Sequence, residues 1–223
     1  MTSDRAPLQN RVTPAGEIVS TAARGSMMGN RGGCFHTPDQ TLGRRRWASK
    51  QWICCRLEFK GRKRAVMQPG LYTELFFLDE ITALAAGHRP CFECRRDDAL
   101  IFAALWAQAD GRKGRATAPE MDVVLHAERL DAAGAKRTDR ARLTRLPAGS
   151  FFLWGGTSCV LASLRDGVPQ CLLWRPEGYA PLPAPPDEAA EVDVLTPPSI
   201  RRVMNQGYWP ALPVLARAGG LHL

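Results

Sequence analysis

Short stretches of the chain alternate between apolar and polar positions with a period of two, the pattern of strands that bury one face. The stretch 52–59 is one example, and we expect its inward face to carry Ile53, Cys55, Leu57 and Phe59. Two further strands are predicted at 17–21 and 72–77, the second after a turn at 67–70.

In the middle of the chain the apolar residues are spaced by three and four, which predicts amphipathic helices. A short helix begins after Asp79, which can cap the free N–H groups, and Gly87 ends it in a position that accepts a left-handed residue. A longer helix is predicted over 97–109. A third helix has Pro119 in its first turn and is expected to end at Gly134.

From residue 143 the period returns to two, and three short strands joined by glycine-containing turns are predicted up to residue 174. Residues 181–187 are rich in proline, which predicts a linker or a surface loop. A last strand over 192–195 precedes a short helix for which Thr196 is the expected cap.

These elements predict an α+β protein with a mixed domain over residues 1–142 and a small, mainly β part over residues 143–223. The chain has 223 residues, 45% hydrophobic and 23% charged, which excludes a collagen-like, a disulfide-scaffold and a wholly disordered protein. No apolar run approaches the roughly 18 residues of a membrane helix. The N-terminal stretch has no apolar signal-peptide core, so we expect a cytoplasmic protein with no membrane partner.

Cysteine spacing gives the clearest chemical signal. The chain has seven cysteines, and in a reducing cytoplasm they are not expected to form disulfides. Cys91 and Cys94 form a C-x-x-C knuckle, whose two thiolates can bind one tetrahedral Zn²⁺. The partial positive charge of the helix that follows favours the thiolate form. A redox dithiol is the alternative, but that motif normally follows a strand, and this knuckle lies between two predicted helices.

Zinc needs two further ligands, and no second C-x-x-C is present. Cys55 is the expected third ligand, because it lies on the inward face of the strand 52–59. His36 is the expected fourth ligand, on a glycine-flanked loop that could close over the site, and Cys34 is its substitute. Cys54 points the other way, and His88 is expected to pack or to face water. The prediction is therefore a closed, structural Cys3His zinc site within the domain 1–142.

Residues 52–98 resemble the N-terminal metal-binding domain of the Ada family of alkyl-DNA repair proteins. The resemblance rests on AAGHRPCFEC at 85–94 and, more weakly, on WICC at 52–55. It implies that Cys91 and Cys94 bind zinc, that the protein contacts DNA, and that Cys54 or Cys55 takes the position of the thiolate that accepts a methyl group from a phosphotriester. The family has Cys-x-x-x-Cys in its first half, whereas this chain has two adjacent cysteines.

The net charge of +8 favours a polyanionic partner. Residues 44–64 contain nine basic residues and one acidic residue, with two tryptophans interleaved that could stack on bases. We expect this segment and the knuckle to form a surface for DNA, or for RNA; the alternative is a charged, solvated strand edge. The residues predicted to contact nucleic acid are Arg44, Arg45, Arg46, Trp47, Lys60, Arg62, Lys63, Arg64, Arg95 and Arg96.

Two other functions also fit the sequence. In an enzyme, zinc with three protein ligands could activate water, with His126 or Glu74 handling protons, or Cys54 or Cys55 could act as an alkyl acceptor. In an interaction module, the C-terminal β part and the proline-rich segment would bind another protein. No P-loop, no dinucleotide-binding fingerprint, no serine-hydrolase motif and no zinc-protease motif occurs in the chain.

Overall fold

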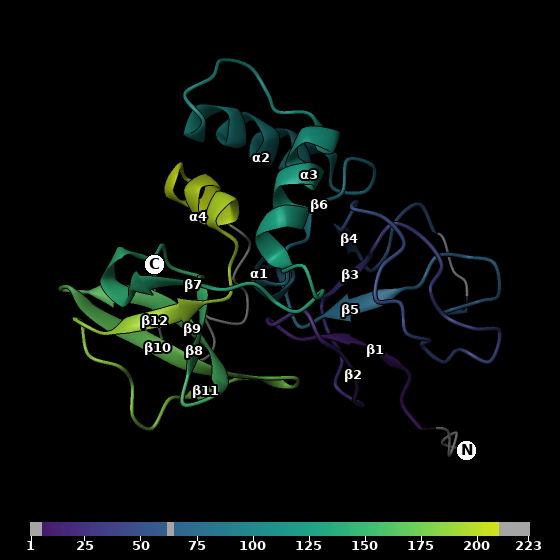
Figure 1. Ribbon diagram of the computed structural model, residues 1–223, viewed down its shortest axis with the longest axis horizontal. Coiled ribbons are helices and arrows are strands. Elements are labelled where there is room, and N and C mark those ends of the chain that lie inside the picture. Colours follow the sequence, from purple (N-terminus) through teal and green to yellow (C-terminus); the bar gives the residue numbers. More distant parts are fainter. Residues whose placement is uncertain (1–5, 62–64, 210–223) are drawn as a thin grey trace.

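The computed structural model describes residues 6–61 and 65–209 (Figure 1). Within these residues the chain forms two six-stranded sheets and four α-helices, which confirms the predicted α+β class. In the described part no helix combines the length and the apolar character needed to cross a bilayer.

The first sheet is built entirely from the N-terminal ninety residues. Its strand order is β2-β1-β5-β3-β4-β6. In that order the strands are Ile18–Ser20, Gln9–Val12, Leu75–Phe77, Met27–Asn30, Ile53–Arg56 and Arg89–Pro90. The pairs β1–β5 and β4–β6 are parallel. The pairing of β4 with the two-residue β6 brings the end of the first sheet next to the C-x-x-C knuckle.

In the second sheet all neighbouring strands pair antiparallel, in the order β11-β10-β9-β8-β12-β7. Its strands are Gly178–Pro181, Val168–Arg175, Thr157–Arg165, Phe151–Trp154, Glu191–Val194 and Asp139–Arg142. A short 3-10 helix, Leu143–Arg145, follows β7. The domain boundary after residue 142 stays a prediction; β7, which precedes it, belongs to this second sheet.

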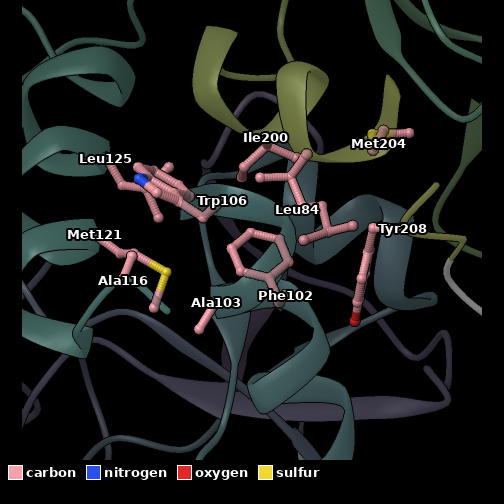
Figure 2. Packing of buried hydrophobic residues seen from close by; sticks show 11 residues of the cluster. Leu84, Phe102, Ala103, Trp106, Ala116, Met121, Leu125, Ile200, Met204 and Tyr208 are labelled. Carbon is pink, nitrogen blue, oxygen red and sulfur yellow. The ribbon is translucent and has the colours of Figure 1, made fainter. Parts of the chain in front are cut away.

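Three helices pack together beside the sheets: α2 (Arg96–Ala109), α3 (Ala118–Arg129) and α4 (Pro198–Asn205). Figure 2 shows their shared core, in which α4 contributes Ile200 and Met204 and the following turn contributes Tyr208. The last helix of the described chain therefore completes a core that begins more than a hundred residues earlier. The buried members of this core are Leu84, Phe102, Ala103, Trp106, Ala116, Met121, Leu125, Ile200, Val203, Met204 and Tyr208.

The remaining helix, α1 (Glu80–Ala85), is buried on all sides. Leu84 belongs to the core of α2, α3 and α4. Ala83 packs in the core of the first sheet, and Ile81 and Ala85 pack with residues of the second sheet. One six-residue helix thus joins three hydrophobic clusters, and in Figure 1 it lies at the centre, where the two sheets and the helices meet.

The ends of α1 follow the sequence pattern. Asp79 caps the helix by accepting a hydrogen bond from the Thr82 N–H at 2.9 Å. Gly87 follows the helix with φ +87°, a conformation that L-residues rarely adopt, and a Cβ there would lie 2.7 Å from Arg129 Cδ.

Other boundaries differ from the prediction. Helix α3 ends at Arg129 instead of Gly134, because Leu130 is extended and forms a β-bridge with Lys136. Thr196 does not cap α4, since its hydroxyl accepts a hydrogen bond from the Phe151 N–H and Pro197 takes the capping position. Strand β4 ends before Leu57, whose side chain is 46% exposed and not on an inward face.

Because α1 is central, truncation of its leucine is expected to lower the free energy of unfolding more than truncation of an exposed leucine. Leu84→Ala is expected to lower the free energy of unfolding by about 3 kcal/mol, because it removes buried methyl groups and leaves a cavity. Leu164→Ala, at a side chain that is 42% exposed, should change it by less than about 0.5 kcal/mol. Urea unfolding followed by circular dichroism measures both values, and equal values would contradict the role assigned to α1.

Candidate metal centre

The structure brings three cysteines together. The sulfur atoms of Cys55, Cys91 and Cys94 all lie within 4.8 Å of one another, so this group could hold a metal ion. Cys55 lies on β4, and Cys91 follows directly after β6. The parallel pairing of the two strands, continued by a hydrogen bond from the Cys91 N–H to the Cys54 carbonyl at 3.0 Å, sets the position of Cys91 beside Cys55.

The turn of the knuckle sets the position of Cys94, the last residue of the C-x-x-C motif. The Arg95 N–H donates to the Cys91 carbonyl at 3.1 Å, which closes the turn and leads into α2. The Glu93 N–H donates to Cys91 Sγ at 3.4 Å. Cys55 and Cys91 are buried, whereas Cys94 is partly exposed, so the cluster is covered on the strand side and approachable on the side of the turn.

Hydrogen bonds connect the three thiols of the cluster. Hydrogen bonds from Cys55 and Cys94 lower the pKa of Cys91, which is the sulfur that accepts them. The same contacts, together with burial, raise the pKa of Cys55. These hydrogen bonds favour the thiolate form of Cys91, which is the form that binds a metal ion.

His36, the predicted fourth ligand, does not belong to this cluster. Its Nδ1 lies 2.8 Å from the Thr73 hydroxyl, and its Nε2 lies 3.1 Å from the Gln68 carbonyl. Cys34, the predicted substitute, lies beside His36, with its sulfur 3.7 Å from Nδ1. The loop that carries both residues packs against the 68–73 segment because Thr73 bonds both His36 and the Phe35 N–H.

His88 is completely buried and packs between aromatic rings, with ring centroids 5.0 Å from Trp52 and 4.7 Å from Phe77. Burial, followed by repulsion from Arg31 and Arg129, holds its pKa well below the ordinary value, so the ring is neutral. It is a packed residue in the described structure and not a member of the metal cluster.

Cys54 lies on the opposite side of β4 and is fully buried. Arg95 Nη1 donates to its sulfur at 3.7 Å, and burial raises the pKa of the thiol. A buried, protonated thiol is a poor nucleophile. Of the two cysteines that the resemblance offered for the reactive position, Cys55 is therefore the one placed at the metal cluster.

Arg95 was predicted to contact nucleic acid, but its charge is used inside the protein. Its guanidinium pairs with Glu80 at 2.7 Å and with Asp98 at 2.9 Å, and its side chain is buried. Tyr208 donates to the second oxygen of Glu80 at 2.7 Å. The network links the residue after the knuckle to the first residue of α1 and to the turn after α4.

The other predicted nucleic-acid residues are mostly on the surface. Those that are exposed are Arg44, Arg45, Lys60 and Arg96, and those that are half-buried are Arg46 and Trp47. Arg96 lines the same surface cleft as Cys91. The predicted residues Arg62, Lys63 and Arg64 lie outside the described residues. Trp52, the second tryptophan of the segment, is buried and cannot stack on a base.

The candidate proton-handling residues lie away from the cluster of sulfurs. His126 Nδ1 accepts from Arg129 Nη2 at 3.2 Å, and partial burial lowers the pKa of the ring. Glu74 is buried and accepts from the Met67 N–H at 2.7 Å. Glu128 accepts from the N–H and the hydroxyl of Ser199, so it caps the start of α4.

A second group of charged residues, which the sequence patterns do not predict, surrounds Trp52. Arg31 and Arg129 are both buried, and the carbon of each guanidinium lies within 4 Å of the centre of the Trp52 ring. The sequence gives one indication that Arg129 is buried, because it lies four residues after Leu125 on the buried face of α3. For Arg31 the local sequence offers no such signal.

Comparison of this chain with protein-family models, with curated proteins and with solved structures finds no match. The resemblance of residues 52–98 to the Ada family therefore stays a prediction, and the site is interpreted from its own geometry.

The buried position of Arg95 predicts a structural effect that its neighbour does not share. Arg95→Met should lower the free energy of unfolding by about 3 kcal/mol, because it leaves Glu80 buried without its ion pair. Arg96→Met, at an exposed side chain, should change it by less than about 0.5 kcal/mol. Urea unfolding of both variants decides the point; equal stability would show that the network around Arg95 does not form.

Proposed function

We propose that this protein binds one zinc ion through Cys55, Cys91 and Cys94 and associates with nucleic acid through exposed basic residues of the segment 44–64 together with Arg96. The observation that carries the zinc proposal is the grouping of three sulfurs within 4.8 Å. Tetrahedral zinc with Zn–S bonds of about 2.3 Å needs sulfurs about 3.8 Å apart, which this spacing accommodates. Thiolates also select zinc over the hard cations magnesium and calcium.

The ion would act first as a structural link. Cys55 belongs to β4, Cys91 follows β6 and Cys94 precedes α2, so one ion would tie a sheet edge to the start of a helix. Among the described residues, three cysteines form the cluster, and no histidine or carboxylate joins them. The fourth coordination position would therefore be filled by water or by a donor atom from a bound molecule. The proposed site therefore differs from the closed Cys3His site expected from the sequence, in which His36 is the fourth ligand.

A second candidate function is catalysis by zinc-bound water. It is favoured by the cleft of about 620 Å³ that Cys91 lines together with Arg89 and Arg96, since a substrate could approach the ion from that side. Zinc K-edge absorption spectroscopy tests the catalytic role: catalysis requires three sulfurs and one exchangeable light atom around the ion, and a fourth protein ligand would exclude it.

The nucleic-acid proposal rests on charge. The net charge is +8, and the exposed side chains of Arg44, Arg45, Lys60 and Arg96 are free to approach a phosphate backbone. Trp47 is half-buried, so part of its ring remains accessible for stacking.

Metal content provides the first test of the zinc proposal. Wild-type protein purified without chelator is expected to contain about one zinc per chain by elemental mass spectrometry, and Cys55→Ser and Cys91→Ser should each lose most of it, because a thiolate ligand is removed. Cys159→Ser serves as the matched control, since Cys159 is a buried cysteine of the second sheet.

The same measurement tests the position of His36. His36→Ala should keep its zinc, because both ring nitrogens of His36 are within hydrogen-bonding distance of Thr73 and Gln68, away from the cluster. Loss of zinc from folded His36→Ala would place the loop over the site. Absence of metal from wild-type protein that retains seven reactive thiols after denaturation would refute the zinc proposal.

Salt dependence tests the nucleic-acid proposal. Binding of a fluorescent DNA duplex or RNA strand is expected to weaken steeply with salt, and Arg44→Ala with Arg45→Ala should reduce the slope of log K against log salt by about two. Arg165→Ala with Arg175→Ala removes the same charge from exposed positions of the second sheet and should leave the slope closer to wild type. Absence of binding at low salt, or equal effects of the two double variants, would overturn it.

A further inference from the structure

A second cavity, separate from the cysteine cluster, lies around Trp52. It has a volume of about 460 Å³ and is lined by the β1–β2 hairpin, by the end of α3 and by the turn that follows it. Four cationic side chains line it: Arg31, Arg46, Arg129 and Lys136. The cavity is therefore strongly positive. It lies against the first sheet and the end of α3, and none of the predicted metal ligands lines it.

Two of the cations are held in place by Trp52. The guanidinium carbon of Arg31 lies 3.8 Å from the ring centre and that of Arg129 lies 3.9 Å from it. Arg31 is 2% exposed and Arg129 is fully buried. Stacking on an aromatic ring fixes the plane of a guanidinium and stabilises its charge, so both groups are preorganised.

The direct hydrogen bonds of these cations go mainly to backbone carbonyls. Arg31 donates to the Gly16 carbonyl at 2.8 Å, and Lys136 donates to the Ala85 carbonyl at 2.6 Å. Arg129 donates to the carbonyls of Gly87 and Lys50. Its Nε has no hydrogen-bond partner in the part of the chain that the structure describes. Carbonyl dipoles satisfy the N–H groups only in part and do not neutralise the charge.

The nearby carboxylates pair with other arginines or are exposed to solvent. Asp122 accepts two hydrogen bonds from Arg89, at 2.9 and 2.8 Å. Asp139 pairs with Arg201. Glu17 lines the cavity but is exposed to solvent. The positive charge inside the cavity thus exceeds the negative charge that the described residues supply.

Burial, with a smaller contribution from repulsion by other cations, lowers the pKa values of two of these side chains. Burial, followed by repulsion from Arg31 and Arg129, lowers the pKa of Lys136 to about 7. Burial and the repulsion of Arg89 also outweigh the attraction of Asp122 and lower the pKa of Arg129 to about 9. An anion bound among these cations would offset the repulsion between them and would favour their charged forms.

We propose that this cavity binds the phosphate group of a small phosphorylated molecule, or free phosphate itself. A phosphate dianion matches the three inner cations Arg31, Arg129 and Lys136 better than a single carboxylate does, and guanidinium and ammonium groups are its usual protein partners. The proposal does not depend on zinc or on nucleic-acid binding.

The cavity walls also suit a planar group attached to the phosphate. Trp47 lines this cavity and the neighbouring surface pocket, and its ring remains half-exposed. A base or another flat ring could stack there while its phosphate occupies the cationic end. This favours a mononucleotide-sized ligand over a larger one, given the volume of about 460 Å³.

Isothermal titration at constant ionic strength tests the proposal, with inorganic phosphate, adenosine monophosphate and adenosine as the probes. Saturable binding of phosphate or of the monophosphate, with adenosine much weaker, is the expected result. Equal affinity for phosphate and the monophosphate would identify the free anion as the ligand class, and tighter binding of the monophosphate would identify a nucleotide. No saturable binding of either, or equal binding of adenosine and its monophosphate, would overturn the proposal.

A substitution that removes one cationic group from the cavity locates the site. Lys136→Gln should weaken the affinity for the phosphate-bearing probe about tenfold, because it removes one charge-assisted hydrogen bond. Lys113→Gln, at an exposed lysine before α3 that does not line the cavity, should leave the affinity unchanged. Thermal unfolding without ligand confirms that both variants fold. Equal affinities for the two folded variants would show that binding, if present, is elsewhere.

Discussion

The complete burial of helix α1 is the constraint on which the rest of the structure depends. A helix with no solvent-facing side must satisfy its polar ends inside the protein, and partners from distant segments do so. At its start, Asp79 caps the first turn and accepts from the Tyr179 hydroxyl of the second sheet at 2.7 Å. At its end, Lys136 and Arg129 donate to its last carbonyl and to that of the following turn. Because β6 begins only two residues after Gly87, the same helix positions the strand that leads into the cysteine cluster.

The parts of the site that can be predicted from the sequence are those set by local geometry. Cys91 and Cys94 are only three residues apart, so the local turn closed by the Arg95 N–H and the Cys91 carbonyl is enough to bring their sulfurs together. The capping residue Asp79 and the left-handed Gly87 define α1 within one residue at each end. Even Cys55 could be chosen over Cys54, because neighbouring residues of a strand point to opposite faces.

The parts that could not be predicted depend on contacts between distant residues. The position of His36 is set by Thr73 and Gln68, more than thirty residues away, and nothing in its own loop reveals these partners. Leu57 follows the alternating pattern of β4 but lies beyond its last paired residue, so the pattern continues where the strand does not. Arg31 looks like a surface residue in sequence, yet the stacking on Trp52 keeps it buried. Periodicity describes a segment, whereas these outcomes depend on its neighbours.

The place of α4 has a consequence for how the chain acquires its structure during synthesis. The core around Phe102 and Trp106 is closed by Ile200, Met204 and Tyr208, so its N-terminal elements leave the ribosome long before their last partners. Until residues 198–208 emerge, the apolar faces of α2 and α3 lack their cover, and Glu80 lacks the hydroxyl of Tyr208. The nascent chain must therefore carry exposed hydrophobic surface through the whole translation of the second sheet, an interval in which chaperone protection has most effect.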